Sequence, residues 1–273
     1  MREEPDIQAE RCASMIERSR SIVLLSGAGM STNAGLPDFR GPNGIYRQKM
    51  NVDPEMIFDI DQFWARPDFF YSFHREFVRA VEKISPTFGH VFFAALENTG
   101  KMLGIITQNI DALHQKAGSR NVLEIHGSSW KNFCTRCGHG YDYYHMIRKM
   151  ETEEVPRCEN CGGVIKPDIV FFGENVKNLH KCQDMASTAD LMLVAGSSLA
   201  VFPAALLPSM CHGKIVIVNK GEISLSYLPR ERLALHIEED IDEFFETVNS
   251  YLKIAVGKCP DCHSFRSGKE LNP

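Results

Sequence analysis

The chain has 273 residues, of which 44% are hydrophobic and 24% charged, and it carries a formal net charge of −5. These values are typical of a globular protein and exclude collagenous and disordered classes. The negative charge and the lack of a dense Lys/Arg block argue against direct nucleic-acid binding, which depends on neutralising phosphates. The length predicts one large domain, or one domain with a smaller insertion.

The first twenty residues include acidic side chains and lack the apolar core of a signal peptide. No later segment reaches about eighteen consecutive apolar residues, so we expect no membrane segment and a cytoplasmic protein. Four of the nine cysteines form two close pairs. This usage is typical of metal binding in a reducing compartment and not of a disulfide scaffold.

The first predicted element is a surface helix over residues 6–20, with Ile7, Ala13 and Ile16 among charged residues, leading into a strand at Ile22–Leu25. Short β-rich runs predict five more strands, at 102–106, 122–125, 191–195, 214–218 and 233–237. Helical patterns precede two of them, at 89–98 and 179–188, and an amphipathic helix closes the pattern at 241–252. This alternation predicts an α/β fold, a mostly parallel sheet with helices on both faces.

Two segments interrupt the alternation and are predicted to be insertions. Residues 42–88 are rich in Phe, Asp and Pro and contain helix-like pieces around 54–60 and 67–83. Residues 131–166 contain the cysteine pairs.

Polar or glycine-rich loops follow five of the predicted strands. In a parallel sheet such loops project from one edge, where α/β proteins bind ligands, so they predict a single extended cleft. The five loops are Gly27–Gly29, Thr107–Asp111, His126–Ser129, Gly196–Ser198 and Asn219–Gly221.

The first of these loops resembles a dinucleotide-binding turn. Gly27 and Gly29 allow a tight turn and a close approach of a pyrophosphate to the backbone. Thr32 stands where the third glycine of the GxGxxG fingerprint would fall, and no strand ending in an acid follows about twenty residues later. The pattern therefore argues against an ordinary dehydrogenase, and a glycine turn without a ligand stays open as an alternative.

The cysteine pairs are Cys134–Cys137 and Cys158–Cys161, two CxxC motifs about twenty residues apart. Four thiolates form a closed tetrahedral site, which predicts one structural zinc ion that stabilises a small insertion. A redox CxxC is the competing interpretation, but it does not explain two matched pairs.

His126 is the candidate catalytic residue, because it ends a predicted strand and should face the cleft with Asn109 and Asp111. A histidine side chain accepts a proton near neutral pH. His114 falls inside a predicted helix, where a packing role is favoured. The segment Lys166–Glu174 is either a buried crossover strand or an exposed edge that pairs with an extended peptide.

Taken together, the motifs GAGMS, GLPDFRGPNGIY, TQNIDALH, HGS, the paired CxxC, KPDIVFFGE, GSSL and VNKG resemble the signature of the sirtuins, the NAD-dependent protein deacylases. The resemblance runs from about Arg11 to Leu252. It implies a Rossmann-like large domain formed by 1–41, 89–130 and 167–257. It also implies a small domain formed by the helical insertion 42–88 and the zinc module 131–166, with residues 258–273 as a C-terminal tail.

The resemblance also implies the site residues. NAD would bind to the glycine loop, the PDFR segment and the loops after the later strands: Gly27, Ala28, Gly29, Thr32, Asp38, Phe39, Arg40, Gln108, Ile110, Asp111, Gly196, Ser197, Ser198, Asn219, Lys220 and Ile241. His126 and Asn109 would be catalytic. The acyl-lysine protein or peptide would contact Val170, Phe171, Gly173 and Glu174, and the zinc ligands would be Cys134, Cys137, Cys158 and Cys161.

In the implied reaction, nicotinamide leaves as the acyl oxygen attacks the ribose C1′, and His126 acts as general base on the ribose hydroxyls. The products are free lysine and O-acyl-ADP-ribose. Two alternatives stay open: a sirtuin-like mono-ADP-ribosyltransferase, and a non-enzymatic NAD-sensing or zinc interaction module.

Departures from the family pattern bear on the acyl group. Ser197 replaces a common Thr and Ala112 a common Gly, and we expect neither change to prevent NAD binding. Sirtuins that prefer succinyl or malonyl lysine have Tyr-x-x-Arg where this chain has Tyr71 and His74, with Arg75 one position further. Neutral acyl groups are therefore expected, with acidic ones open if His74 is protonated. The tail carries Cys259, Cys262 and His263, and neither its role nor the oligomeric state follows from the sequence.

Overall fold

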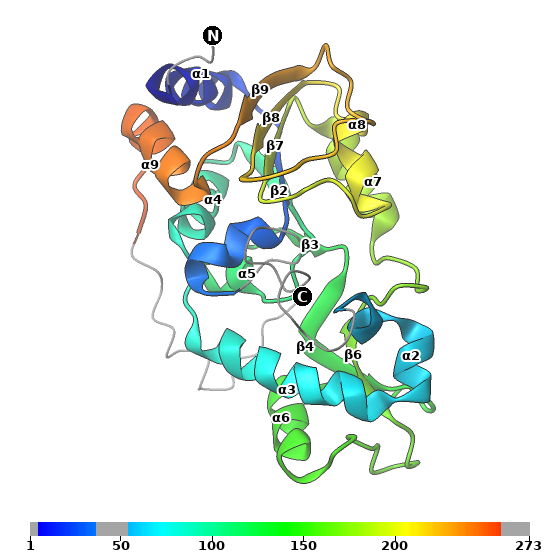
Figure 1. The fold of residues 1–273 in the computed structure, drawn as a ribbon. Coiled ribbons are helices and arrows are strands. Elements are labelled where there is room, and N and C mark those ends of the chain that lie inside the picture. Colours follow the sequence, from blue (N-terminus) through cyan, green and yellow to red (C-terminus); the bar gives the residue numbers. More distant parts are fainter. Residues whose placement is uncertain (1–4, 37–53, 258–273) are drawn as a thin grey trace.

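The computed structural model describes residues 5–36 and 54–257, and its main feature is a six-stranded parallel sheet (Figure 1). The strand order is β3-β2-β1-β7-β8-β9. Every neighbouring pair is parallel. The strands are β1 (Ile22–Ser26), β2 (Met102–Thr107), β3 (Val122–Glu124), β7 (Leu191–Ala195), β8 (Lys214–Val218) and β9 (Leu233–Ile237). All six predicted strands are confirmed, and so is the parallel α/β class.

The central strands are buried on both faces, which explains their continuous apolar sequences. Each residue of β1 and β7 is buried. Alternate side chains of these strands enter two different hydrophobic clusters: Leu24 lies in one and Leu25 in the other. The sheet therefore forms the middle layer of three.

Helices cover both faces of the sheet. One layer contains α1 (Pro5–Arg18), α4 (Phe88–Asn98) and α9 (Ile241–Leu252), and the rings of Phe93 and Phe245 lie 4.8 Å apart between two of them. The other contains α7 (Leu179–Thr188), the short 3-10 helix η4 (Ala204–Leu206) and α8 (Leu207–Met210). The helices predicted at 89–98, 179–188 and 241–252 are confirmed.

The buried face of α1 differs from the prediction at one position. Ile7 is 44% exposed, whereas Ala9, Cys12, Ala13 and Ile16 are buried. These four follow the i, i+3, i+4, i+7 spacing of one helix face, and at about 100° per residue Ile7 points elsewhere.

The two predicted insertions pack together into a second unit. The zinc-module part is a three-stranded antiparallel sheet of order β5-β4-β6, formed by β4 (Gly127–Cys134), β5 (Gly140–Asp142) and β6 (Ile165–Ile169), with α6 (Tyr143–Thr152). The helical part contains η3 (Pro54–Phe58), α2 (Ile60–Ala65) and α3 (Pro67–Lys83). A third hydrophobic cluster, rich in aromatic rings, joins the two parts.

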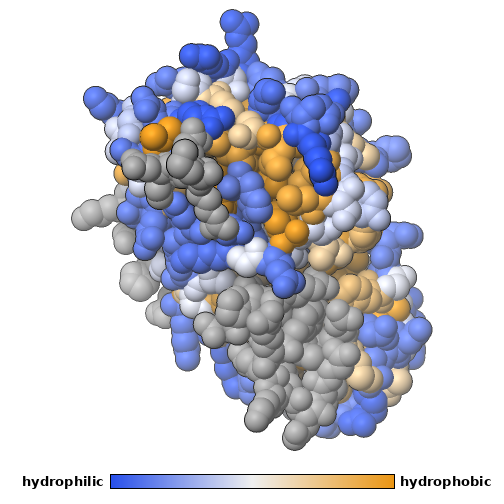
Figure 2. All heavy atoms as spheres, turned by 45° about the horizontal axis from the view of Figure 1, so that its top comes forward, coloured by the Kyte–Doolittle hydropathy of each residue, from blue (hydrophilic) through white to orange (hydrophobic). Residues whose placement is uncertain are grey.

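The face seen in Figure 2 is largely hydrophilic, with apolar residues gathered across its upper middle and others along its right side. Within the part of the chain that the structure describes, no helix has both the length and the apolar character needed to cross a bilayer.

The predicted boundaries of the zinc module, 131 and 166, lie inside strands of the antiparallel sheet. β4 begins earlier, at Gly127, and β6 ends later, at Ile169.

Candidate active site

The five strand-end loops line one cleft with a volume of about 1390 Å³. The cleft lies between the parallel sheet and the second unit, because its lining also includes residues of η3, of α3 and of the segment after β6. The loops therefore meet at one edge of the sheet, as predicted from the parallel strand order.

Two glycine turns form the floor of the cleft. Gly29 donates its N–H to the Gly196 oxygen over 2.9 Å, so the loops after β1 and β7 touch through backbone alone. A Cβ added at Gly27 would lie 2.6 Å from the Gly196 oxygen, and one at Gly29 would lie 2.8 Å from the Gly196 Cα. The glycines are required for this contact, and the bare backbone leaves room for a phosphate-bearing ligand.

The loop after β2 is held against the glycine turn by a polar network. Asn109 donates through Nδ2 to the Gly27 oxygen at 3.0 Å and to Ser31 Oγ at 3.2 Å. Ser31 donates to Asp111 Oδ2 at 2.7 Å, and the Leu113 N–H donates to Asp111 Oδ1 at 2.9 Å. Burial raises the pKa of Asp111, while the bonds from Leu113 and Ser31 oppose that change. The network fixes Asn109 and Asp111 at the cleft wall.

His126 lies on the cleft wall with one ring nitrogen occupied. Its Nδ1 is 3.1 Å from the Gln108 main-chain oxygen. Because a carbonyl oxygen only accepts, Nδ1 carries the proton and Nε2 keeps its lone pair. Burial lowers the pKa of His126, and the bond to Gln108 opposes this effect. The arrangement gives a neutral imidazole that can accept a proton through Nε2.

His114 is buried away from the cleft, as its predicted packing role requires. Its Nε2 lies 2.9 Å from Ser26 Oγ, and Ser26 in turn donates to Thr107 Oγ1 at 2.9 Å. Burial lowers the pKa of His114 to about 3. Thr107 also accepts the Asn109 N–H at 3.1 Å, so this polar chain supports the β2 loop from below.

The segment after β6 combines features of both predicted alternatives. Val170 donates its N–H to the His126 oxygen, and Phe172 donates to the Phe58 oxygen at 2.7 Å. Phe171 is buried at 1% exposure, whereas Phe172 is 42% exposed. The segment is thus paired on one side by backbone bonds and also lines the cleft, together with Gly173 and Glu174.

The loops after β7 and β8 line the cleft with Ser197, Ser198, Asn219 and Lys220, and Ile241, the first residue of α9, lines it as well. Gln108 Nε2 donates to Ser197 Oγ at 2.8 Å and joins the loop after β7 to the His126 side. Lys220 pairs with Asp240 at 3.0 Å.

Every described residue predicted to bind the cofactor or the substrate lines the cleft. Asp38, Phe39 and Arg40 lie outside the described residues, as do Cys259, Cys262 and His263. Sequence reasoning missed Ser31 and one face of α3, formed by Phe73, Glu76, Phe77 and Ala80. The spacing of these four positions follows a helix face and was a usable signal.

The residues that bear on acyl preference point away from the cleft. The Tyr71 hydroxyl donates to the Ile165 oxygen, and Arg75 Nε donates to the Met150 oxygen at 2.8 Å. His74 is buried, and burial followed by the charge of Arg75 lowers its pKa to about 3. Among the described residues that line the cleft, none of these three occurs. A protonated His74 that receives an acidic acyl group does not fit this packing.

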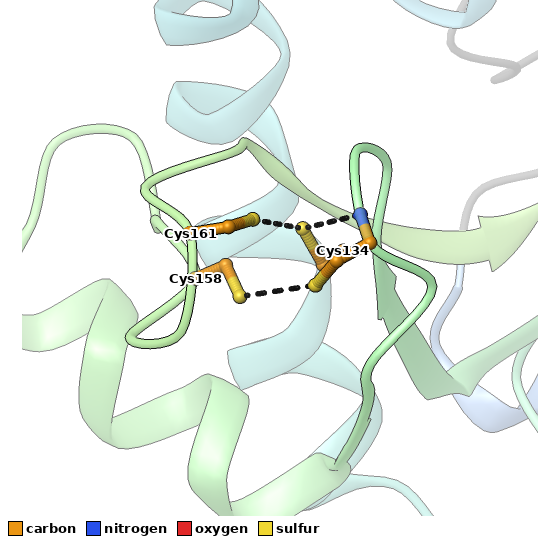
Figure 3. A group of neighbouring side chains, drawn as sticks. Cys134, Cys158 and Cys161 are labelled. Atoms are coloured by element: carbon orange, nitrogen blue, oxygen red, sulfur yellow. Dashed lines mark hydrogen bonds between the residues drawn. The ribbon is translucent and has the colours of Figure 1, made fainter.

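The four predicted zinc ligands converge. Their sulfur atoms lie within 4.8 Å of one another, with 3.4 Å between Cys134 and Cys161 and 3.6 Å between Cys137 and Cys158 (Figure 3). Tetrahedral zinc with Zn–S bonds of about 2.3 Å needs sulfurs about 3.8 Å apart, so the donor set fits zinc. The Tyr141 hydroxyl donates to Cys158 at 3.1 Å and lowers the pKa of that thiol to about 6. The close approaches across the two motifs favour a shared metal over two redox pairs.

The fold and site together define an α/β dinucleotide-binding protein with a structural zinc module beside its cleft. A profile of the Sir2 family matches residues 27–203. The chain belongs to the Sir2 family, the sirtuins, which confirms the resemblance and the Rossmann-like architecture.

Relatives and solved structures agree with this assignment. An "NAD-dependent protein deacetylase" of Thermotoga maritima is 46% identical over 213 residues, which cover 76% of this chain and 85% of the relative. One of Sulfolobus acidocaldarius is 38% identical over 250 residues, or 90% and 96% of the two chains. The structure "Sir2-p53 peptide-NAD+" has a TM-score of 0.80 at 40% identity and covers 90% of this chain and 99% of its own. "Structure of Sir2Tm bound to a propionylated peptide" has a TM-score of 0.80 at 39% identity, with 91% and 100% covered.

Proposed function

We propose that this chain is an NAD-dependent protein-lysine deacylase that acts mainly on acetyl-lysine. It releases nicotinamide, O-acyl-ADP-ribose and the free lysine side chain. The observation that carries the proposal is His126, whose Nδ1 is bonded to Gln108 in the wall of a cleft that the glycine turns and the segment after β6 also line. The deacetylase relatives and the peptide-bound and NAD-bound Sir2 structures support this assignment.

The glycine turns and the loops after β7 and β8 bind the cofactor. The lack of a Cβ at Gly27, Gly29 and Gly196 leaves room for the pyrophosphate close to the backbone, and Ser197 and Asn219 hold the adenosine half. When bound, NAD supplies a ribose carbon that gives up nicotinamide and accepts the acyl oxygen. Asn109 and Asp111 position groups at the nicotinamide end, where the bonds to Gly27, Ser31 and Leu113 keep them from rearranging.

His126 acts as the general base. The proton on Nδ1 remains there, in the hydrogen bond to the Gln108 main-chain oxygen. Nε2 is therefore the atom that receives a proton from a ribose hydroxyl. The lowered pKa keeps the imidazole neutral and ready to accept at pH 7. The surrounding burial excludes water from the reacting groups and strengthens their electrostatic interactions.

The substrate is an acyl-lysine side chain of a protein or peptide. Val170, Phe171 and Ile110 give the cleft wall apolar contacts, which favour a neutral acyl group. Solved Sir2 relatives bound to acetylated and propionylated peptides support the same substrate class. The net charge of −5 favours a protein partner over nucleic acid. Four free cysteines that serve as metal ligands are typical of a reducing compartment, which supports a cytoplasmic location.

The test is a panel of acetyl, propionyl, longer neutral and succinyl lysine peptides with NAD, read as nicotinamide release. We expect the acetyl peptide to turn over and the succinyl peptide to turn over at least about tenfold more slowly. In His126→Ala, loss of the base should lower turnover at least about 100-fold, with NAD binding retained.

His212 gives a matched control, because its Nδ1 also lies close to a main-chain oxygen, that of Ser187 at 2.8 Å, but it is not among the described cleft residues. His212→Ala should keep full turnover. Transfer of ADP-ribose to unmodified protein, or NAD binding without nicotinamide release, would contradict the proposal.

A further inference from the structure

Lys166 is a buried lysine next to the cleft that takes no part in the proposed reaction. It lies on β6, and its side chain is 2% exposed. Burial of an ammonium group is costly unless several partners replace its water. Three groups do so here. Nζ donates to the Ile169 oxygen at 2.7 Å and to Glu174 Oε2 at 2.9 Å, and it lies 4.0 Å from the centre of the Phe171 ring.

All three partners belong to the cleft wall. Ile169, Phe171 and Glu174 line the cleft, so the ammonium lies behind the segment 170–174, which we call the substrate loop. Glu174 Oε2 also accepts the Phe171 N–H at 2.9 Å. Glu174 Oε2 therefore connects Lys166 to the backbone of the substrate loop. The cation–π contact between the Lys166 ammonium and the Phe171 ring is a second interaction with the same loop.

The substrate loop is fixed on its other side as well. The Phe171 ring packs against Phe63 at 5.4 Å and Phe70 at 5.0 Å. Gly173 has a φ of +93°, a backbone conformation that favours glycine, and a Cβ there would lie 2.8 Å from the Ile60 side chain. The loop is thus held between an aromatic cluster and Lys166.

Lys166 also connects the substrate loop to the zinc module. In the β4–β6 pair, Lys166 is opposite Phe133, and its neighbour Ile165 is opposite the zinc ligand Cys134. A side chain on a strand anchored beside the metal is a rigid support, because the strand cannot shift without disturbing the metal ligands.

We propose that Lys166 is a positioning residue for the acyl-lysine substrate: through Glu174 and Phe171 it holds the substrate loop in the conformation that binds the peptide. The inference rests on the proposed function and deepens it. In this arrangement Glu174 stabilises the substrate loop, because its Oε2 accepts hydrogen bonds from Lys166 and from the Phe171 N–H. This role differs from the direct substrate contact expected from the sequence. Loss of the lysine should affect peptide binding far more than NAD binding, because in the described part of the chain its ammonium group contacts Ile169, Phe171 and Glu174 and not the glycine turns.

The test compares Lys166→Met and Lys166→Arg with wild type. The acetyl-lysine peptide dissociation constant is measured by fluorescence anisotropy without NAD, and KM is measured for peptide and for NAD. We expect Lys166→Met to raise the peptide dissociation constant and KM at least tenfold, with KM for NAD within twofold. Lys166→Arg keeps the cation and should recover most of the peptide affinity.

Lys149 offers a matched control. It is also buried and paired with carboxylates, Glu153 at 2.7 Å and Glu159 at 3.4 Å, but it lies on α6 and not among the described cleft residues. Lys149→Met should leave the peptide dissociation constant within twofold. An equal change in the two methionine variants, or equal changes in KM for peptide and NAD, would overturn the inference.

Glu174→Gln keeps the inference testable if Lys166→Met fails to fold, as judged by zinc content and circular dichroism. It should weaken peptide binding with NAD binding unchanged, and an unchanged peptide dissociation constant would count against the inference. The two proposals fail separately. If wild type releases no nicotinamide from any acyl peptide, the proposed function is wrong, whereas an active wild type with unaltered peptide binding in both variants refutes only the role of Lys166.

Discussion

The Nδ1 atom of His126 lies 3.1 Å from the main-chain oxygen of Gln108. The two residues are eighteen positions apart in the chain and come from the loops after β3 and β2, which are neighbouring parallel strands. The bond selects the tautomer in which Nε2 is the basic atom. The sheet itself therefore sets the chemistry of the proposed base.

The same contact leads to a pH prediction. Burial disfavours the charged imidazole, so the pKa of His126 is below 6.5 and the basic form remains present at lower pH than in a solvated histidine. We expect kcat/KM for the acetyl peptide to fall on the acid side with an apparent pKa below 6.5. Nicotinamide release between pH 5 and 8 measures it, and a midpoint above 6.5 would rule out a burial-lowered base.

The backbone contact between glycine turns gives a second prediction. In Gly27→Ala the new Cβ would meet the Gly196 oxygen at 2.6 Å and the Ser197 Cα at 2.9 Å, so the loops after β1 and β7 must separate. We expect a stability loss of about 1–3 kcal/mol, and NAD affinity at least about tenfold weaker, or about 1.4 kcal/mol. Gly140→Ala, where a Cβ meets nothing within 4 Å, is the control. Denaturant unfolding and NAD titration of both variants would decide, and equal behaviour would contradict the required contact.

Much of the fold could be predicted from the sequence because its signals are local. A strand buried on both faces needs a continuous apolar run, so β1 and β7 could be recognised without their partners. The strand-end loops could be placed together because parallel strands align their carboxyl ends. The four metal ligands could also be predicted from local sequence, because each CxxC motif supplies two thiolates at the spacing that a tetrahedral zinc site requires.

The remaining features depend on partners distant in the sequence. Tyr71 and Arg75 turn away from the cleft because carbonyl groups of Ile165 and Met150 accept their hydrogen bonds. Ser31, about eighty positions earlier in the chain, forms hydrogen bonds with both Asn109 and Asp111. No periodicity or motif encodes such contacts, because each one forms only when segments distant in the sequence have packed together.

Removal of zinc is the third prediction. Zinc at this site would join Cys134, at the end of β4, to the loop before β6 that carries Cys158 and Cys161. A chelator, or Cys158→Ser, should therefore loosen the second unit. We expect a melting temperature lower by about 10 °C, together with loss of peptide binding. Calorimetry and metal analysis measure these changes. Cys182→Ala, on α7, should keep one zinc per chain. Full activity of a zinc-free chain would show that the metal does not support the site.

The last prediction concerns acid stability and His74. The ring stacks on Phe70 at 5.0 Å and on Phe77 at 6.3 Å, and burial lowers its pKa to about 3, against 6.5 for a solvated histidine. Below pH 6.5 the His74 side chain is protonated in the unfolded chain but stays neutral in the native one. The free energy of unfolding therefore decreases as the pH is lowered from 6.5 to 3. At pH 5.5 this loss is about 1.4 kcal/mol.

His74→Leu removes that proton-binding difference while keeping an apolar side chain against the two rings. The loss of unfolding free energy between pH 7.5 and 5.5 should therefore be about 1.4 kcal/mol smaller in the variant than in wild type. Because the comparison is between two proteins with the same zinc site, proton uptake by the metal ligands cancels in the difference. Urea unfolding at the two pH values measures it. The same pH-dependent loss in both proteins would mean that His74 already binds a proton in the folded state at pH 5.5.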